Sequence, residues 1–319
     1  MITRSAFRPA WWLPGPHLQT LYPALFRKRK APRLTRERFE LADGDFLDID
    51  WTRHTGGMRV LILHGLEGSL DSHYTGGLLH ALQQSGYTAG LMYFRGRSGE
   101  PNRLSRSYHS GDTADLEEIM QRISQQQTGT GIAVVGFSLG GNVLLKWLGE
   151  KGQSAGIVTA IAISVPLNLH HAALKLDRGL SRIYQRHLLQ KLRESVTAKA
   201  VLHSPPFPLD RLRELSTFRK FDNEITAPLH GFRDVDDYYA RSSSKQFLKN
   251  IQIPTLLLQA IDDPFLPASA LPTNDELSAF VTMELSKRGG HVGFVSGSNP
   301  LQPHYWLEER ILQHLNEHG

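Results

Sequence analysis

Apolar and polar positions alternate along this chain in the manner of an α/β protein. Short apolar, often β-branched runs predict buried strands, and between them apolar residues recur at helical spacing. We predict strands near residues 59–63, 88–93, 132–135, 157–163, 254–259 and 281–285, helices near 71–84, 112–126, 140–150 and 303–317, and an N-terminal hairpin from 38–41 and 46–52. This order favours a mostly parallel, twisted sheet with helices on both faces.

The long stretch between Pro166 and Asn250 interrupts that alternation. A short crossover would suffice to connect the strands on either side of it. Residues 170–200 inside it keep roughly helical apolar spacing, at Leu174, Leu180, Ile183, Leu188, Leu192 and Val196. We therefore expect an amphipathic cap helix whose Leu180, Ile183 and Leu188 side faces the active site. The expected organisation is a first part of the core with an N-terminal extension (1–165), a helical cap insertion (166–250) and the remainder of the core (251–319).

The most informative local pattern is Gly136-Phe137-Ser138-Leu139-Gly140, between the run Ile132–Val135 and a helix-forming stretch. A Gly-x-Ser-x-Gly turn between strand and helix is typical of a nucleophilic serine, because side chains at the two glycine positions would clash in so sharp a turn. Such a short pattern also occurs by chance in glycine-rich loops, but the flanking strand and helix favour Ser138 as a nucleophile.

A serine hydroxyl needs a base, and the base needs an orienting carboxylate, which on this arrangement follow in the order Ser, Asp or Glu, His. Asp262 and Asp263 come directly after the predicted strand 254–259, and His291 lies on a glycine-flanked loop after the last strand. A solvated turn and a surface histidine are the simpler explanations of each alone. Of the two neighbouring aspartates we favour Asp263, since Pro264 biases it to an extended backbone.

Acyl transfer also needs N–H donors where negative charge develops on the substrate oxygen. We expect one donor to be the backbone N–H of Leu139, directly after the serine. The strand at 59–63 opens into His64-Gly65-Leu66-Glu67-Gly68-Ser69, which makes the N–H of Leu66 the second candidate. The alternative is an ordinary turn at the end of the strand.

Taken together, the motifs resemble those of the α/β-hydrolases, and more narrowly of the AB hydrolase-4 family with its YheT-like bacterial hydrolases. The resemblance covers residues from about 7 to about 312. It is carried by Gly15-Pro16-His17-Leu18-Gln19-Thr20, His64 to Ser69, Phe94-Arg95-Gly96, Gly99 to Arg103, Tyr108 to Thr113, Gly136 to Asn142, Pro228 to Phe232, Asp237 to Tyr239, Ala260 to Phe265 and Gly289 to Phe294.

This resemblance implies the α/β-hydrolase fold and a carboxylester hydrolase with Ser138, an aspartate of the pair Asp262 and Asp263, and His291 as its triad. We expect no cofactor. We expect the enzyme to cleave short- to medium-chain acyl esters. Some family members act on acylglycerols or phospholipids and others transfer acyl chains to an alcohol, so acyl transfer is an alternative. A non-catalytic binder on the same scaffold is another. Where the family has Arg-Gly-Cys, this chain has Arg95-Gly96-Arg97, which we expect to be a surface-loop change without mechanistic weight.

Composition limits which other chemistries and cellular locations we expect. The chain has no cysteine, which excludes disulfides and thiolate chemistry. His170-His171 lacks the spacing of a zinc hydrolase, so no metal ligands are expected. The later His304, His314 and His318 are expected to be solvated. No apolar stretch could span a bilayer and no signal peptide is recognisable, which predicts a cytoplasmic protein.

Charge adds little to the expected partners. The net charge is +5, with a basic cluster at Arg27-Lys28-Arg29-Lys30, Arg33, Arg36 and Arg38. We expect a solvated charged face, with at most weak peripheral membrane association. No zinc-finger, RNA-binding or helix-turn-helix pattern supports nucleic-acid binding. The expected partner is a small ester or lipid-like substrate, and no obligate protein partner is evident.

Overall fold

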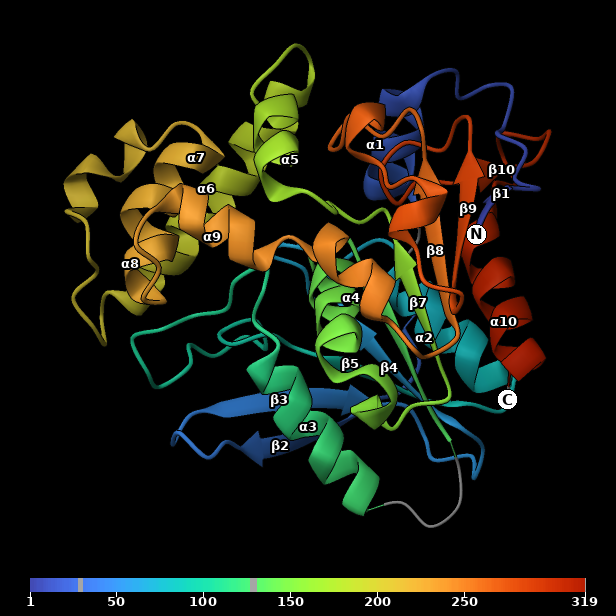
Figure 1. Cartoon of the computed structure of the whole chain (residues 1–319), viewed down its shortest axis with the longest axis horizontal. Coiled ribbons are helices and arrows are strands. Elements are labelled where there is room, and N and C mark those ends of the chain that lie inside the picture. Colours follow the sequence, from blue (N-terminus) through green and yellow to red (C-terminus); the bar gives the residue numbers. More distant parts are fainter. Residues whose placement is uncertain (28–30, 127–130, 319) are drawn as a thin grey trace.

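A nine-stranded sheet runs through the centre of the molecule (Figure 1). The computed structural model describes residues 1–27, 31–126 and 131–318. The strand order in the sheet is β1-β9-β8-β7-β6-β4-β5-β3-β2, and only the pairs β5 with β3 and β3 with β2 are antiparallel. The strands are β1 Ile2–Arg4, β2 Thr35–Glu40, β3 Phe46–Trp51, β4 Arg59–Leu63, β5 Thr88–Met92, β6 Ile132–Phe137, β7 Thr159–Ile163, β8 Thr255–Ala260 and β9 Val281–Ser286. A separate antiparallel pair joins β10 Val295–Ser296 to β11 His304–Tyr305.

Helices cover both faces of the sheet and also form the insertion between β7 and β8. The α-helices are α1 Pro16–Phe26, α2 Thr75–Gln84, α3 Ala114–Gln125, α4 Leu139–Lys151, α5 Leu169–Leu176, α6 Ser181–Lys199, α7 Phe218–Phe221, α8 Ala227–Leu229, α9 Val235–Ser242 and α10 Trp306–His318. Short 3-10 helices are η1 Gly152–Ala155, η2 Leu209–Glu214, η4 Ser244–Asn250, η5 Ala268–Ala270 and η6 Asn274–Glu276, and η3 Asp222–Thr226 is a π-helical turn.

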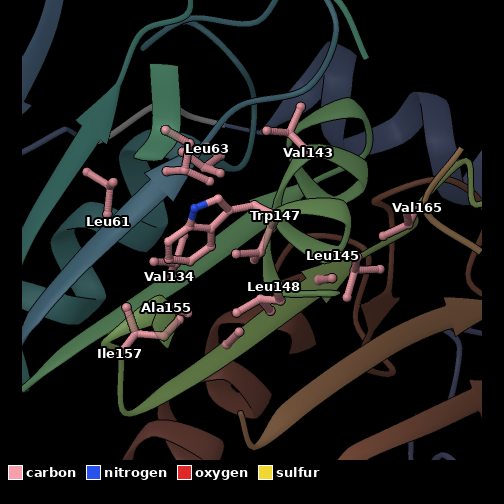
Figure 2. Packing of buried hydrophobic residues seen from close by; sticks show 14 of the residues in the cluster. Leu61, Leu63, Val134, Val143, Leu145, Trp147, Leu148, Ala155, Ile157 and Val165 are labelled. Carbon is pink, nitrogen blue, oxygen red and sulfur yellow. The ribbon is translucent and has the colours of Figure 1, made fainter. Parts of the chain in front are cut away.

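Two apolar layers form the core on either side of the sheet. Buried side chains of α3 and α4 pack on one face, and those of α2 and α10 pack on the other. Figure 2 shows the first layer, where Trp147 of α4 lies against Leu61, Leu63 and Val134 of the central strands. Burial of one such aliphatic side chain contributes about 1.5–3 kcal/mol, so these layers hold the strand ends that carry the candidate site.

The predicted fold class is confirmed. The N-terminal hairpin, the six predicted strands and the four predicted core helices are all present, with boundaries shifted by a few residues. Several elements were not predicted, among them β1, α1, the β10–β11 pair and α7 to α9. Strand β1 extends the sheet beside β9, and α1 contains Pro23 within an apolar stretch too short to show a clear period.

The expected single cap helix is wrong. The chain breaks between α5 and α6, where Gly179 has a left-handed backbone at φ 53°. Within α6, Ile183 and Leu188 are five positions apart and therefore lie about 140° apart around the helix axis, and Leu180 and Ile183 are 61% and 57% exposed. Its inner face instead carries Tyr184 and Leu189, together with the partly buried Leu188, Leu192 and Val196.

The basic cluster near the N-terminus is also not a simple solvated face. Arg27 forms a partly buried ion pair with Glu308 of α10, and its guanidinium lies 4.0 Å from the centre of the Tyr305 ring. Arg36 and Arg38 pair with Asp50 and Asp48 across the β2–β3 hairpin, each at 2.8 Å. Lys28, Arg29 and Lys30 lie outside the described residues. Among the described helices, none is long and apolar enough to cross a bilayer.

Candidate active site

Ser138 occupies the sharp turn between β6 and α4, with φ 50° and ψ −115°. The flanking glycines permit this turn: a Cβ on Gly136 would lie 2.6 Å from the carbonyl oxygen of Gly140, and a Cβ on Gly140 would lie 2.5 Å from that of Leu63. The expected clash is therefore real. A non-glycine residue in this conformation costs about 1–3 kcal/mol and persists only where the surroundings enforce it.

The three residues predicted from different parts of the sequence come together at the carboxyl ends of β6, β8 and β9. His291 Nε2 lies 3.0 Å from Ser138 Oγ, and His291 Nδ1 lies 2.9 Å from Asp263 Oδ2. Asp263 is 2% exposed. Since a carboxylate only accepts hydrogen bonds, it favours the tautomer with the proton on Nδ1, which leaves the Nε2 lone pair facing the serine hydroxyl.

Asp263 and Asp262 differ in their surroundings. The carboxylate of Asp263 also accepts hydrogen bonds from Gln259 Nε2 at 3.1 Å and from the N–H of Phe265 at 2.7 Å. Asp262 turns away and accepts the N–H of Gly290 at 3.0 Å, and burial raises its pKa. The geometry therefore joins Asp263, and not Asp262, to His291.

Several contacts hold the His291 loop, and the sequence analysis missed most of them. The His291 N–H donates to Thr20 Oγ1 of α1 at 2.9 Å, and the Val292 N–H donates to Ser164 Oγ at 2.9 Å. The Phe265 ring stacks on the imidazole at 3.8 Å. Val292 and Ser164 both have left-handed backbones. Thr20, the last residue of the Gly15–Thr20 motif, thus supports the histidine.

The loop after β4 lies directly beside the serine, since a Cβ on Gly65 would lie 3.3 Å from Ser138 Cβ. Tyr74 Oη accepts the N–H of Gly65 at 2.9 Å and Tyr108 Oη accepts the N–H of Glu67 at 2.8 Å. In the part of the chain that the structure describes, the intervening Leu66 N–H has no acceptor. Leu139 is the first residue of α4, so its N–H is not used by the helix either. Both predicted donors are therefore available.

His64 begins the same loop, but both of its ring nitrogens contact backbone groups, which gives it a structural role. Its Nδ1 lies 2.7 Å from the Gly65 carbonyl oxygen, and its Nε2 accepts the N–H of Phe94 at 3.1 Å. Complete burial lowers its pKa to about 4. A neutral imidazole thus fixes the backbone of the loop.

The expectation that Arg97 is a surface change without mechanistic weight is wrong. Its Nη1 lies 2.8 Å from Oε2 of Glu67, a residue of the loop after β4 that is 4% exposed and has φ 53°. Ser195 of α6 donates to the same carboxylate oxygen at 2.6 Å, and Tyr108 donates to the other at 2.8 Å. Arg97 therefore belongs to a buried link between that loop and the cap.

A pocket of about 750 Å³ opens beside this link. Leu66 and Leu139 line it at the site, and its walls include the apolar side chains of Leu192 and Val196 from α6 and of Phe218 from α7. Arginine and lysine side chains, among other polar groups, line other parts of it. Leu66 and Leu139, which carry the two candidate N–H donors, thus line a space that can hold a substrate with an apolar portion, although Ser138 and His291 are not among its lining residues.

Comparison with known proteins agrees with this arrangement. Residues 59–298 match the family model described as alpha/beta hydrolase fold. The chain is 39% identical to the protein named "Putative esterase YheT" of Escherichia coli (strain K12), over 92% of this chain and 88% of that protein. It is 28% identical to Phospholipase ABHD3 of Mus musculus, over 100% of this chain and 80% of that protein.

The fold also matches solved structures. The Pyrococcus furiosus esterase Pf2001 superposes with a TM-score of 0.59 at 17% identity, covering 90% of this chain and 94% of the esterase. Identity this low speaks for the fold alone. The family-model match over most of the chain and the 39% identity to the Escherichia coli protein show that this chain belongs to the α/β-hydrolase family.

Proposed function

We propose that this protein is a serine carboxylester hydrolase that works through an acyl-enzyme formed on Ser138. The observation that carries the proposal is the continuous chain of short contacts from Ser138 Oγ through His291 to Asp263, at 3.0 and 2.9 Å. This is the arrangement that activates a hydroxyl for attack on a carbonyl. Relatives named as an esterase and a phospholipase support the same reaction class.

In the proposed mechanism, His291 Nε2 takes the proton of Ser138 as Oγ attacks the ester carbonyl carbon. The N–H groups of Leu66 and Leu139 stabilise the oxyanion of the tetrahedral intermediate. His291 then gives its proton to the leaving alcohol, and the acyl-enzyme remains. Water attacks the acyl-enzyme in the same way, with His291 again as the base, and Asp263 keeps the imidazole in the productive tautomer throughout.

The proposed substrates are short- to medium-chain acyl esters, including lipid-like ones. The apolar walls that α6 and α7 give the pocket support an acyl group as the part recognised. We assign residues 166–250 as the cap and residues 1–165 and 251–319 as the hydrolase core, because α5 to η4 are inserted between β7 and β8 and α6 lines the pocket.

Labelling with a fluorophosphonate probe tests the proposal most directly. The wild-type chain should be labelled and should hydrolyse a medium-chain ester. Ser138→Ala should lose both, because removal of a triad serine costs about a million-fold in kcat. Ser154→Ala, at an exposed serine of η1, is the matched control and should behave as wild type.

Two results would contradict the proposal. Wild-type turnover by a folded Ser138→Ala variant would remove the serine from the mechanism. A wild-type chain that binds esters without labelling or turnover would indicate a binder on this scaffold. Acyl transfer is distinguished from hydrolysis by analysing the products in the presence of an added alcohol. An acyltransferase forms a new ester, whereas the hydrolase forms free acid.

A further inference from the structure

The last turns of α10 bring three potential metal ligands together on one face of the helix. His314, Glu317 and His318 have the spacing i, i+3 and i+4, which places side chains on the same side of a helix. One ligand atom from each lies within 4.8 Å of the other two. Glu317 and His318 reach solvent, whereas His314 is only 6% exposed. The expectation that His314 is solvated is therefore wrong.

Hydrogen bonds define which nitrogen of His314 is free. Thr159 Oγ1 lies 2.8 Å from the carbonyl oxygen of Pro254 and must donate its proton there, because the carbonyl has none. The same Oγ1 lies 2.8 Å from His314 Nε2 and can only accept from it. Nε2 thus carries the proton of the neutral ring, and Nδ1 presents a lone pair.

The same reasoning applies to His318. Its Nδ1 lies 2.9 Å from the carbonyl oxygen of His314 and must donate to it, which leaves Nε2 with a lone pair. The two rings lie together, with centroids 4.3 Å apart. In protein metal sites, a ligating histidine almost always donates its other N–H to an oxygen in this way. Both histidines therefore already have the outer hydrogen bonds of a metal ligand.

We propose that His314 Nδ1, His318 Nε2 and the Glu317 carboxylate bind a divalent transition-metal ion of the zinc class. Two imidazoles and one carboxylate are a donor set that zinc takes at about 2.0–2.2 Å, in a tetrahedron whose ligand atoms lie roughly 3.4 Å apart. One ligand atom of each residue already lies within 4.8 Å of the other two, and water can complete the coordination.

The position of the site indicates a structural role. Thr159 is the first residue of β7, so the site lies at the end of the parallel strands opposite to Ser138. The C-terminal end of α10 is also remote from the cap helices (Figure 1). A bound ion would cross-link the last turns of α10, where His314 is already hydrogen-bonded to Thr159 of the sheet, without touching the residues proposed for ester hydrolysis.

Calorimetric titration of the untagged, chelator-treated chain with zinc chloride tests the proposal. We expect one ion per chain and a higher midpoint of thermal unfolding with zinc, since an ion that binds the folded state stabilises it. His318→Gln and Glu317→Gln, both at positions that reach solvent, should fold normally and weaken zinc binding by at least about tenfold. His171→Gln, at an exposed histidine of the cap, is the matched control and should bind as wild type.

Unchanged zinc affinity in His318→Gln would overturn the proposal, as would equal losses in His318→Gln and His171→Gln, which indicate scattered weak binding by surface histidines. Thr159→Val adds a test of the outer hydrogen bond and should weaken zinc binding about 10- to 100-fold. Since no substrate enters these measurements, their failure is distinct from failure of the proposed esterase function.

Discussion

Asp262 and Asp263 are adjacent in the chain, yet only the carboxylate of Asp263 reaches His291, at 2.9 Å. Asp263→Asn should lower kcat by up to about ten-thousand-fold, because the amide no longer favours the histidine tautomer with its lone pair toward Ser138. Asp262→Asn is the matched control. Its amide oxygen can still accept the N–H of Gly290, so kcat should fall far less. Steady-state ester hydrolysis by both variants measures this, and the reverse ranking would reassign the acid.

The buried His64 leads to a prediction about how the stability of the fold depends on pH. Its pKa in the folded chain is about 4, below the value of about 6.5 in an unfolded chain. Between these values the unfolded chain binds the additional proton. The contribution of His64 to stability is therefore complete above about pH 6.5 and is lost as the pH falls to about 4, by an amount of about 3 kcal/mol.

Nuclear magnetic resonance of the imidazole signals checks this pKa. The His64 signals should remain those of a neutral ring down to about pH 4. A His64 signal that titrates near pH 6.5 would contradict the packing of the loop after β4. Denaturant unfolding at several pH values gives the accompanying loss of stability.

Between elements, the Glu67 carboxylate connects the loop after β4 to α6 through Arg97 and Ser195. Arg97→Ala leaves a buried carboxylate without its cation, which should destabilise the fold by about 3 kcal/mol. The loop that carries the Leu66 N–H should lose its position as well, so kcat for ester hydrolysis should fall more than KM changes.

A second substitution separates two effects of Arg97→Ala, which are the unpaired charge left on Glu67 and the lost packing of the arginine side chain. Adding Glu67→Gln to Arg97→Ala removes the unpaired charge and should restore part of the stability. Arg233→Ala is the control, because Arg233 forms an exposed ion pair with Asp234 and such pairs contribute little. If Arg97→Ala matches Arg233→Ala in unfolding midpoint and kcat, the link has no role in positioning the loop.

For the whole molecule, the pocket between core and cap predicts substrate preference. Each methylene buried against its apolar walls is worth about 0.8 kcal/mol, so kcat/KM should rise up to roughly fourfold per methylene from acetyl esters until the apolar space is filled. A series from acetyl to decanoyl esters, with and without chelator, measures this. Chelator should leave turnover unchanged, since the proposed zinc site lies away from Ser138, and peptides should not be cleaved. Metal-dependent turnover, or amide cleavage without ester cleavage, would contradict the proposed reaction.

The local sequence pattern was enough to predict the core of the sheet and the three residues of the candidate triad. Strand periodicity, the glycines around Ser138 and the placement of Asp263 and His291 after successive strands predicted the sheet and the three residues that meet. They succeed because a parallel sheet brings the carboxyl ends of its strands to one edge. The chain alone could not separate Asp263 from Asp262, although the effect of Pro264 on the preceding backbone favoured Asp263.

Other features depended on partners far away in the chain. The N–H of His291 meets Thr20, 271 positions earlier, and Ser195 of the cap meets Glu67, 128 positions earlier. Nothing in the local sequence of either residue indicates its partner. The inner face of α6 was predicted only in part, since Leu188 packs inward whereas Leu180 and Ile183 are exposed.

Periodicity, turn stereochemistry and strand order along the chain were therefore enough for the core strands and helices, the sheet and the candidate triad. The packing of distant segments was needed to show that Arg97 supports the loop after β4, that α1 supports the His291 loop, and that His314 is buried with its Nδ1 lone pair free. Each of these depends on hydrogen bonds and burial between distant segments. Such interactions are set by how the elements pack in three dimensions and leave no periodic signal along the chain.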